Sequence, residues 1–265
     1  MLNVLGRLMG VQRLLREVLA AAPAPRIAAG PEPGHPAIKV RLCDAAVLIE
    51  TRQFGIGGPC FINLHENEQT SVAAARAVLA LSAGRLVRLC SRGRRHVVFW
   101  DGIRPHVFDP NRIFSDAGIR QTLLQHASLT EPAFEAVRAL RDRLLAQIGR
   151  TDGNPVVALH NNAGRHYSVL AYRPGGPQAG DAAALAIAPA WPAENFFLVN
   201  QKFWFERLRN QGFNVVLQSP TVTDDGSLSV WCQHHGRVYI NVEARHGRLA
   251  AQQQMLRAVT DPPPP

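Results

Sequence analysis

The chain has 265 residues, 46% of them hydrophobic and 18% charged, and a formal net charge of +9. This composition excludes a disordered chain, and the length allows one large α/β domain or two small ones. No uninterrupted apolar run approaches the roughly 20 residues of a membrane-spanning helix, so we expect no membrane span. The charge comes from scattered arginines, whose densest run is 92–95. It fits a basic surface or an anionic substrate as well as a nucleic acid.

The first 36 residues differ in composition from the rest. Leucine and valine recur at helical spacing over 1–22, which predicts an amphipathic helix, and an Ala-, Pro- and Gly-rich linker follows over 20–36. Charged residues interrupt the apolar stretch that a signal peptide needs, so we expect a cytoplasmic protein, or a periplasmic or secreted one if residues 1–25 act as a signal. We therefore expect an N-terminal helix and linker over 1–36, one domain over 37–261 and a proline tail over 262–265.

The remainder alternates between strand and helix patterns. Strands are predicted over 45–50, 59–64, 85–90, 95–100, 156–159, 213–217 and 238–242, with a hairpin partner for 156–159 over 166–172. Helices are predicted over 70–81, 118–126, 132–149 and 247–259, and 194–210 combines a short apolar stretch with a helix. This alternation predicts a single α/β domain with a mixed β-sheet flanked by helices.

A histidine and a glutamate follow the apolar run 59–64. His65 ends the run, and Glu68 comes three residues later, just before a predicted helix. Residues three apart lie on one side of a helical turn, so both side chains can face one point. Imidazole and carboxylate groups suit Zn²⁺, and two histidines with one glutamate form a known catalytic ligand set. The alternative is a loop in which Glu68 only caps the helix.

The strand 156–159 repeats this pattern, because it ends in His160 followed by two asparagines. Two strands that each deliver a histidine to the same edge of a sheet would place both histidines together. His160 is therefore the candidate third ligand. A core histidine at a strand end is the competing interpretation, and His166 is a nearby rival.

Glu243 follows the strongly apolar strand 238–242. Burial raises the pKa of a carboxylate, which suits a general base that works near neutral pH. The alternative is an ion pair with Arg245, which alternation places on the same face of the strand.

A polar pair, Asn111 and Arg112, lies between aromatic residues in the segment 108–114. Arginine binds a carboxylate through two parallel hydrogen bonds, and asparagine can add another. The alternative is a structural loop in which Asp109 accepts hydrogen bonds from Arg112. Asp224 and Asp225 stand beside Gly226, a pattern that indicates a turn rather than a second metal site.

These motifs occur in the order found in the M14-like zinc carboxypeptidases and the related succinylglutamate desuccinylase/aspartoacylase group. The sequence resembles this superfamily over residues 59–247. The resemblance implies a zinc-carboxypeptidase-like α/β fold and a Zn²⁺ ion held by His65, Glu68 and His160.

The resemblance also implies roles for the other candidates. Glu243 corresponds to the general base, and the Asp-x-Asn-Arg motif places Asn111 and Arg112 on the carboxylate of the substrate. Arg104 lies eight residues before Arg112 and resembles a second arginine of the desuccinylase/aspartoacylase branch, where it would support the developing oxyanion.

The resemblance leaves two branches open. The segment 65–68, His-Glu-Asn-Glu, is similar to the His-Gly-Asn-Glu of the deacylase branch, but few residues follow Glu243, so we expect no further C-terminal β-domain. The only tyrosines are Tyr167, Tyr172 and Tyr239. The tyrosine that pancreatic-type carboxypeptidases place well between the last histidine ligand and the glutamate is therefore expected to be absent.

We expect a zinc metallohydrolase, either a metallocarboxypeptidase or an amidohydrolase, that cleaves an amide bond next to a free carboxylate. A carboxypeptidase-type peptidase, with cell-wall-like peptides among its candidate substrates, is favoured over an N-acyl amino acid deacylase. The expected partner is a small peptide or an N-acyl amino acid with a free carboxylate, and a nucleic acid is not favoured. A non-catalytic binding module and a nucleic-acid-binding module are the rival classes.

Overall fold

The computed structural model describes residues 36–126, 128–149, 153–163 and 167–261. The described strands are β1 (Ala37–Leu42), β2 (Ala45–Phe54), β3 (Cys60–Asn63), β4 (Gly84–Cys90), β5 (Val97–Trp100), β6 (Pro105–Phe108), β7 (Val156–Asn162), β8 (Ala182–Ala186), β9 (Phe196–Val199), β10 (Asn214–Gln218) and β11 (Tyr239–Arg245). The described α-helices are α2 (Gln69–Leu79), α3 (Asp116–His126), α4 (Glu131–Ile148), α5 (Lys202–Asn210), α6 (Leu228–His234) and α7 (Leu249–Thr260). The predicted N-terminal helix and the proline tail lie outside the described residues. No described helix combines the length and the apolar character that crossing a membrane requires.

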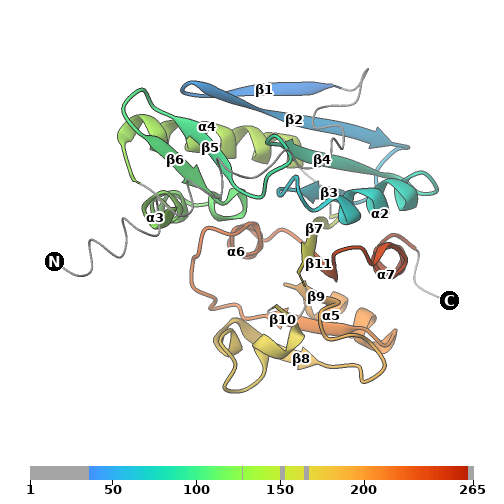
Figure 1. Cartoon of the computed structure of the whole chain (residues 1–265). Helices are drawn as coiled ribbons and strands as arrows, with labels where there is room; N and C mark the ends of the chain where they lie inside the picture. The colour runs from blue at the N-terminus through green and yellow to red at the C-terminus, as the bar shows by residue number, and fades with distance from the viewer. Residues whose placement is uncertain (1–35, 127, 150–152, 164–166, 262–265) are drawn as a thin grey trace.

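A mixed sheet forms the centre of the described structure (Figure 1). Its strand order is β1-β2-β4-β3-β7-β11-β9-β10-β8, and a separate hairpin pairs β5 with β6. The pairs β3–β4, β3–β7, β7–β11 and β9–β10 are parallel, whereas β2–β4, β11–β9 and both edge pairs are antiparallel. The prediction of a single α/β domain with a mixed sheet is confirmed.

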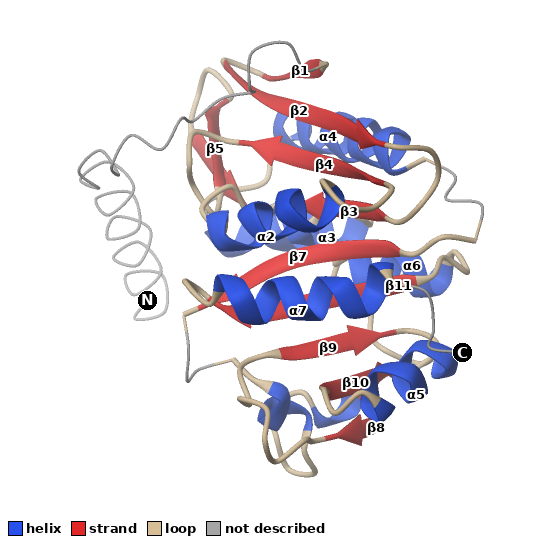
Figure 2. Ribbon diagram, turned by 90° about the vertical axis from the view of Figure 1, so that its right-hand side faces the viewer, coloured by secondary structure: helices blue, strands red, loops and turns tan. Residues whose placement is uncertain are grey.

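Helices cover both faces of this sheet (Figure 2). Helices α2, α5 and α7 pack on one face around one apolar cluster, and α3, α4 and α6 pack on the other around a second cluster. The central strands are therefore buried on both sides, which explains why their sequences read as continuous apolar runs. Every residue of β7 is buried.

The structure corrects the predicted hairpin. The structure describes 167–172 of the predicted partner strand 166–172, and Val169–Tyr172 within it is a 3-10 helix. Strand β7 pairs instead with β3 and β11, which are far away in the sequence. An apolar pattern shows that a strand is buried but does not name its neighbours, so the nearest candidate was a wrong choice.

Short or weakly patterned elements were not predicted: β1, β6, β8 and α6. The predicted helix 70–81 also ends earlier, at Leu79. Gly84 begins β4 with φ 155°, and a Cβ there would lie 2.7 Å from Leu79 Cδ2 and 2.9 Å from Pro59 O. Glycine is therefore required at this position by close packing between α2 and the sheet.

Candidate active site

The carboxyl ends of two central parallel strands carry the candidate metal ligands. His65 and Glu68 follow the end of β3, and His160 lies two residues before the end of β7. Parallel strands β3 and β7 are direct neighbours, so their carboxyl ends meet at the same edge of the sheet. This is the edge at which α/β sheets place their binding sites.

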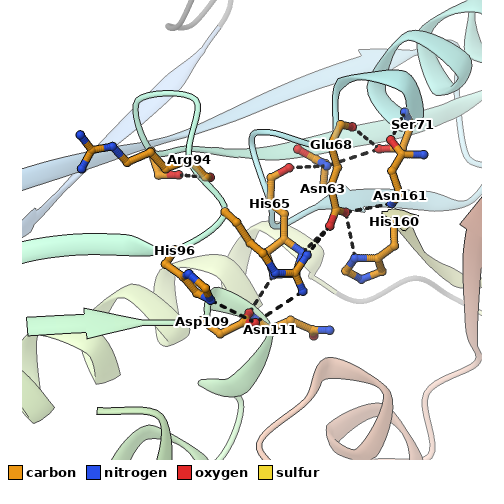
Figure 3. A network of polar contacts seen from close by, with 12 residues as sticks. Asn63, His65, Glu68, Ser71, Arg94, His96, Asp109, Asn111, His160 and Asn161 are labelled. Carbon is orange, nitrogen blue, oxygen red and sulfur yellow. Dashed lines mark hydrogen bonds and ion pairs between the residues drawn. The ribbon is translucent and has the colours of Figure 1, made fainter. Parts of the chain in front are cut away.

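His65, Glu68 and His160 come together as one group (Figure 3). The Nδ1 atom of His65 lies 3.0 Å from Oε1 of Glu68, and the Nδ1 atom of His160 lies 3.0 Å from Oε2 of the same carboxylate. The three side chains are 1%, 3% and 8% exposed in that order. The group could hold a metal ion, because its ligand atoms all lie within 4.8 Å of one another.

Asp109 orients His65. Its Oδ1 atom lies 2.7 Å from Nε2 of His65, so that nitrogen carries the proton donated to the carboxylate. The Nδ1 atom of His65 is then buried without a hydrogen-bond partner of good geometry, although Glu68 lies close to it. Metal-ligating histidines typically donate their other nitrogen to a carboxylate in this way. The unpaired nitrogen and the two-nitrogen, one-carboxylate donor set fit Zn²⁺.

The charges of the group shift the pKa values of its members. Burial by itself raises the pKa of Glu68, but the two adjacent histidines outweigh it and hold that pKa well below its usual range. Burial opposes a low pKa for Asp109 too, and the hydrogen bond and charge of His65 outweigh it. Burial lowers the pKa of His65, whereas Asp109 and Glu68 raise it above the ordinary value. Both carboxylates are therefore ionised at neutral pH, as metal ligation requires.

Glu68 does not cap the helix that follows it. It stands at the N-terminus of α2, but its side chain makes no capping hydrogen bond. Instead Oε2 accepts a hydrogen bond from the backbone amide of Asn161 at 3.1 Å. The side chain of Asn161 in turn accepts from the backbone amide of Ser71 at 2.9 Å. The capping alternative is wrong, and Asn161 ties β7 to the start of α2.

Glu243 lies beside the metal-ligand group. It stands opposite His160 in the register of the parallel pair β11–β7 and is 5% exposed. Burial raises its pKa to about 8, and the negative charge of Glu68 acts in the same direction, while a hydrogen bond from Asn162 opposes them. The alternative pairing with Arg245 is not observed, because that arginine lies 3.7 Å from Glu194.

Asn111 and Arg112 line the same cleft from the 3-10 helix Pro110–Arg112. The Oδ1 atom of Asn111 accepts from the backbone amide of Leu228 at 3.2 Å, which joins this helix to α6. The guanidinium of Arg112 is 42% exposed and lies 3.4 Å from Asp225. The alternative of a structural loop holds for the backbone, because the carbonyl oxygen of Asp109 accepts from the amide of Arg112 at 2.9 Å and its carboxylate accepts from the amide of Asn111.

The structure does not bring Arg104 to this group. Arg104 is exposed in the turn between β5 and β6, where its backbone amide donates to Asp101, and it does not line the cleft. Arg95 lines the cleft instead, and its Nη1 atom lies 2.6 Å from Oε1 of Glu68. The spacing between Arg104 and Arg112 could not show which arginine reaches the cleft. Arg95 comes before the hairpin β5–β6 and Arg104 lies in its turn, so the two point to different places.

Sequence reasoning also missed two tyrosines of the cleft. Tyr167 and Tyr172 both line it, and their hydroxyl oxygens lie 2.8 Å apart. Burial is the main cause that raises the pKa of each phenol, so both stay neutral at ordinary pH. Both tyrosines follow His160 closely in the sequence, so the expected absence of a tyrosine well between His160 and Glu243 stays a prediction. His166, the rival ligand, lies outside the described residues.

The cleft has a volume of about 600 Å³ and continues from the metal-ligand group along β11. Every second residue of β11 faces the cleft, because side chains alternate along a strand. These residues are Tyr239, Asn241 and Glu243. The Oδ1 atom of Asn241 is buried without a hydrogen-bond partner. Asp181 lies farther along, where burial and the nearby Asp225 raise its pKa. A cleft of this volume is within the usual size range of small-molecule sites.

The sequence matches no family model and no curated protein. Its fold is similar to that of several solved structures. A metallopeptidase candidate from Shewanella amazonensis SB2B is 11% identical, with a TM-score of 0.42, over 97% of this chain and 94% of that chain. The ectoine utilization protein EutE (DoeB) from Ruegeria pomeroyi, in a product-bound structure, is 13% identical, with a TM-score of 0.45, over 85% of this chain and 64% of that chain. The murein-tripeptide amidase MpaA from Escherichia coli O157 is 15% identical, with a TM-score of 0.40, over 88% and 96%.

Proposed function

We propose that the chain is a zinc-dependent metallohydrolase that cleaves an amide bond next to a free carboxylate. The favoured substrate is a peptide with a free C-terminal carboxylate. One observation carries this proposal: a buried group of metal-ligand type, a carboxylate with a raised pKa and an asparagine–arginine pair face one cleft.

His65, Glu68 and His160 would hold the zinc ion. A zinc ion at such a site supplies Lewis-acid chemistry. The Oδ1 atom of Asp109 accepts the proton on Nε2 of His65 at 2.7 Å. This hydrogen bond keeps the other nitrogen of the ring, the unprotonated Nδ1, turned toward Glu68. The ligand geometry is therefore held by hydrogen bonds that exist without the ion.

Glu243 is the proposed general base. With a pKa of about 8, a minority of the group is ionised at neutral pH, and that ionised form is the one that can accept a proton. Its carboxylate takes a proton from the attacking water and gives it to the nitrogen of the leaving amine. Asn162 holds the carboxylate by a hydrogen bond while this happens.

Arg112 and Asn111 are the proposed carboxylate binders. The oxygen of the Asn111 side chain is engaged by Leu228, so its amide nitrogen is the end that can donate to a ligand. Arg112 shares its charge with Asp225, but that carboxylate is exposed and leaves other guanidinium donors available. Arg95, rather than Arg104, is the cation that could face the developing negative charge of the scissile carbonyl.

An N-acyl amino acid deacylase is the second candidate. The same cleft volume of about 600 Å³ accommodates a single acylated amino acid, so the volume does not separate the two activities. The likeness of the segment 65–68 to the deacylase motif favours this alternative. A substrate screen separates them, with C-terminal peptides that include cell-wall-like peptides on one side and short N-acyl amino acids on the other.

Metal analysis tests the core of the proposal. We expect about one zinc ion per purified chain. His65→Ala and His160→Ala should each abolish zinc binding, whereas the control His234→Ala, which changes an exposed histidine of α6, should retain it. Full zinc occupancy in the His160→Ala protein would show that another residue, such as His166, completes the ligand set.

A further inference from the structure

The loop between β4 and β5 carries the densest basic run of the sequence. We call residues 91–96 the arginine loop. Its arginines are compatible with a nucleic-acid-binding surface, but the fold places one of them, Arg95, at the candidate active site. Arg94 points away from the metal-ligand group (Figure 3). Arg95, the next residue, lines the cleft.

Glu66 anchors the arginine loop. This glutamate lies between two candidate ligands in the sequence and is 1% exposed. Its Oε2 atom accepts hydrogen bonds from the backbone amides of Ser91 and Gly93, the second at 2.7 Å. A buried carboxylate needs such donors, so the loop and the glutamate stabilise each other.

The loop backbone is shaped for this anion. Arg92 and Gly93 have φ values of 63° and 72°, in the left-handed region. Left-handed residues in a turn direct amide groups toward a common point, which forms a concave anion site. A non-glycine residue at Arg92 is strained in this conformation, and the two hydrogen bonds to Glu66 offset that strain.

The end of the arginine loop reaches two carboxylates of the metal site. The Nη1 atom of Arg95 lies 2.6 Å from Oε1 of Glu68, and its Nη2 atom lies 3.6 Å from Oδ2 of Asp109. Oε1 of Glu68 is also the oxygen that faces Nδ1 of His65. The guanidinium therefore binds the oxygen on which the proposed zinc ion depends.

We infer that Glu66 positions Arg95 as a resident cation on Glu68, and that a zinc ion must displace this cation in order to bind. This inference rests on the proposed function, because it needs the zinc ligands. Glu68 is a buried carboxylate, and Arg95 supplies a positive partner for it in addition to the two adjacent histidines. Displacement leaves Arg95 next to Asp109, where the anchored loop keeps it at the cleft.

Zinc affinity of the full chain tests the inference directly. The affinity is measured by competition with a chromophoric chelator, with Zn²⁺ as the only added ligand. Arg95→Gln should tighten zinc binding by up to about fivefold, because removal of a half-exposed ion pair removes a competitor of about 0.2–1 kcal/mol. Arg95→Lys, which keeps the charge, should remain close to the wild type. The control Arg94→Gln should leave the affinity unchanged.

A double-mutant cycle tests the positioning role of Glu66. Glu66→Ala releases the loop and should tighten zinc binding by a similar factor, and Glu66→Ala combined with Arg95→Gln should add nothing further. Hydrogen exchange provides a readout that needs no metal. The amides of Ser91 and Gly93 should lose protection in Glu66→Ala and in the milder Glu66→Gln to a smaller extent, but should keep it in Arg95→Gln.

The outcomes separate the inference from the proposed function. A wild-type chain that binds no zinc overturns both. Zinc binding that is unchanged or weaker in Arg95→Gln overturns the resident-cation role while the proposed function stands. Additive effects of the two substitutions, or unchanged protection of the loop amides in Glu66→Ala, overturn the positioning role of Glu66.

Discussion

Glu243 lies directly opposite His160 in the register of the parallel strands β11 and β7. Both strands are in the middle of the sheet and are almost fully buried. The proposed base is therefore joined to a proposed metal ligand by backbone hydrogen bonds rather than by a flexible loop. A site on rigid central strands holds its groups within the small tolerance that catalysis needs.

The role of Glu243 predicts a specific kinetic defect. Glu243→Gln keeps the shape of the side chain but removes the ability to accept a proton. We expect kcat to fall by about 10²–10⁴-fold, with zinc content and KM close to those of the wild type. Steady-state kinetics together with metal analysis measure this. Near-normal turnover would exclude Glu243 as the base.

The role of Arg112 predicts that its loss and the loss of the substrate carboxylate are equivalent. The guanidinium is 42% exposed, so we expect the lower end of the usual range for a truncated charge pair. Arg112→Ala should lose about 2 kcal/mol of transition-state binding, measured as a fall in kcat/KM. Amidation of the substrate carboxylate should lower the kcat/KM of the wild type by a similar factor. The same amidation should lower the kcat/KM of Arg112→Ala only slightly further.

Arg104→Ala is the matched control for this experiment. Arg104 is exposed in the β5–β6 turn, and the substitution keeps the backbone amide that donates to Asp101. We expect its kcat/KM to equal that of the wild type. A loss as large as that of Arg112→Ala would return Arg104 to the site, and equal turnover of acid and amide by the wild type would exclude carboxylate recognition.

A close glycine pair supports the wall of the cleft that carries Arg112. A Cβ on Gly118 would lie 2.3 Å from the Cα atom of Gly226 and 2.7 Å from the carbonyl oxygen of Arg112. Gly118→Ala must therefore push this wall outward. We expect a loss of about 1–3 kcal/mol in the free energy of unfolding, together with a raised KM. Gly180→Ala is the control, because a Cβ there meets nothing within 4 Å; equal effects of the two substitutions would contradict this explanation.

Asp101 predicts a pH-dependent contribution to stability. Its carboxylate accepts from the backbone amide of Arg104 and from His106, Ile103 and Thr130, which hold its pKa well below the usual range. An acid whose pKa is depressed in the folded state stabilises the fold above its unfolded pKa of about 3.9 and loses that contribution as the pH falls through the folded value. Asp101→Asn should therefore be less stable than the wild type at pH 7, and the difference should shrink below about pH 4.

Urea unfolding of both proteins at pH 7, 5 and 3 measures this. Asp142→Asn is the control, since that side chain is 61% exposed beside Arg141 and its substitution should change stability by no more than about 0.5 kcal/mol. A difference between the wild type and Asp101→Asn that is the same at all three pH values would show that the charge of Asp101 does not stabilise the fold.

The sequence by itself determined the class of the fold and most of the candidate site. Strand and helix periodicities are local, so the α/β alternation could be recognised without any knowledge of the contacts. The spacing of His65 and Glu68 is local too, since one turn of chain brings both to one point. His160 and Glu243 were recognisable because each is a titratable residue at the end of an apolar strand, a position that places it at the edge of a sheet.

Only the tertiary structure decided which of the equivalent candidates take part. Arg95 and Arg104 are both arginines in the same stretch of chain, but the β4–β5 loop turns toward the metal-ligand group and the β5–β6 turn faces solvent. The tertiary structure also showed that Glu243 does not form an ion pair with Arg245, because Arg245 pairs with Glu194. Which partner a charged side chain meets depends on long-range strand order, and the strand order results from cooperative packing of the whole sheet rather than from any local pattern.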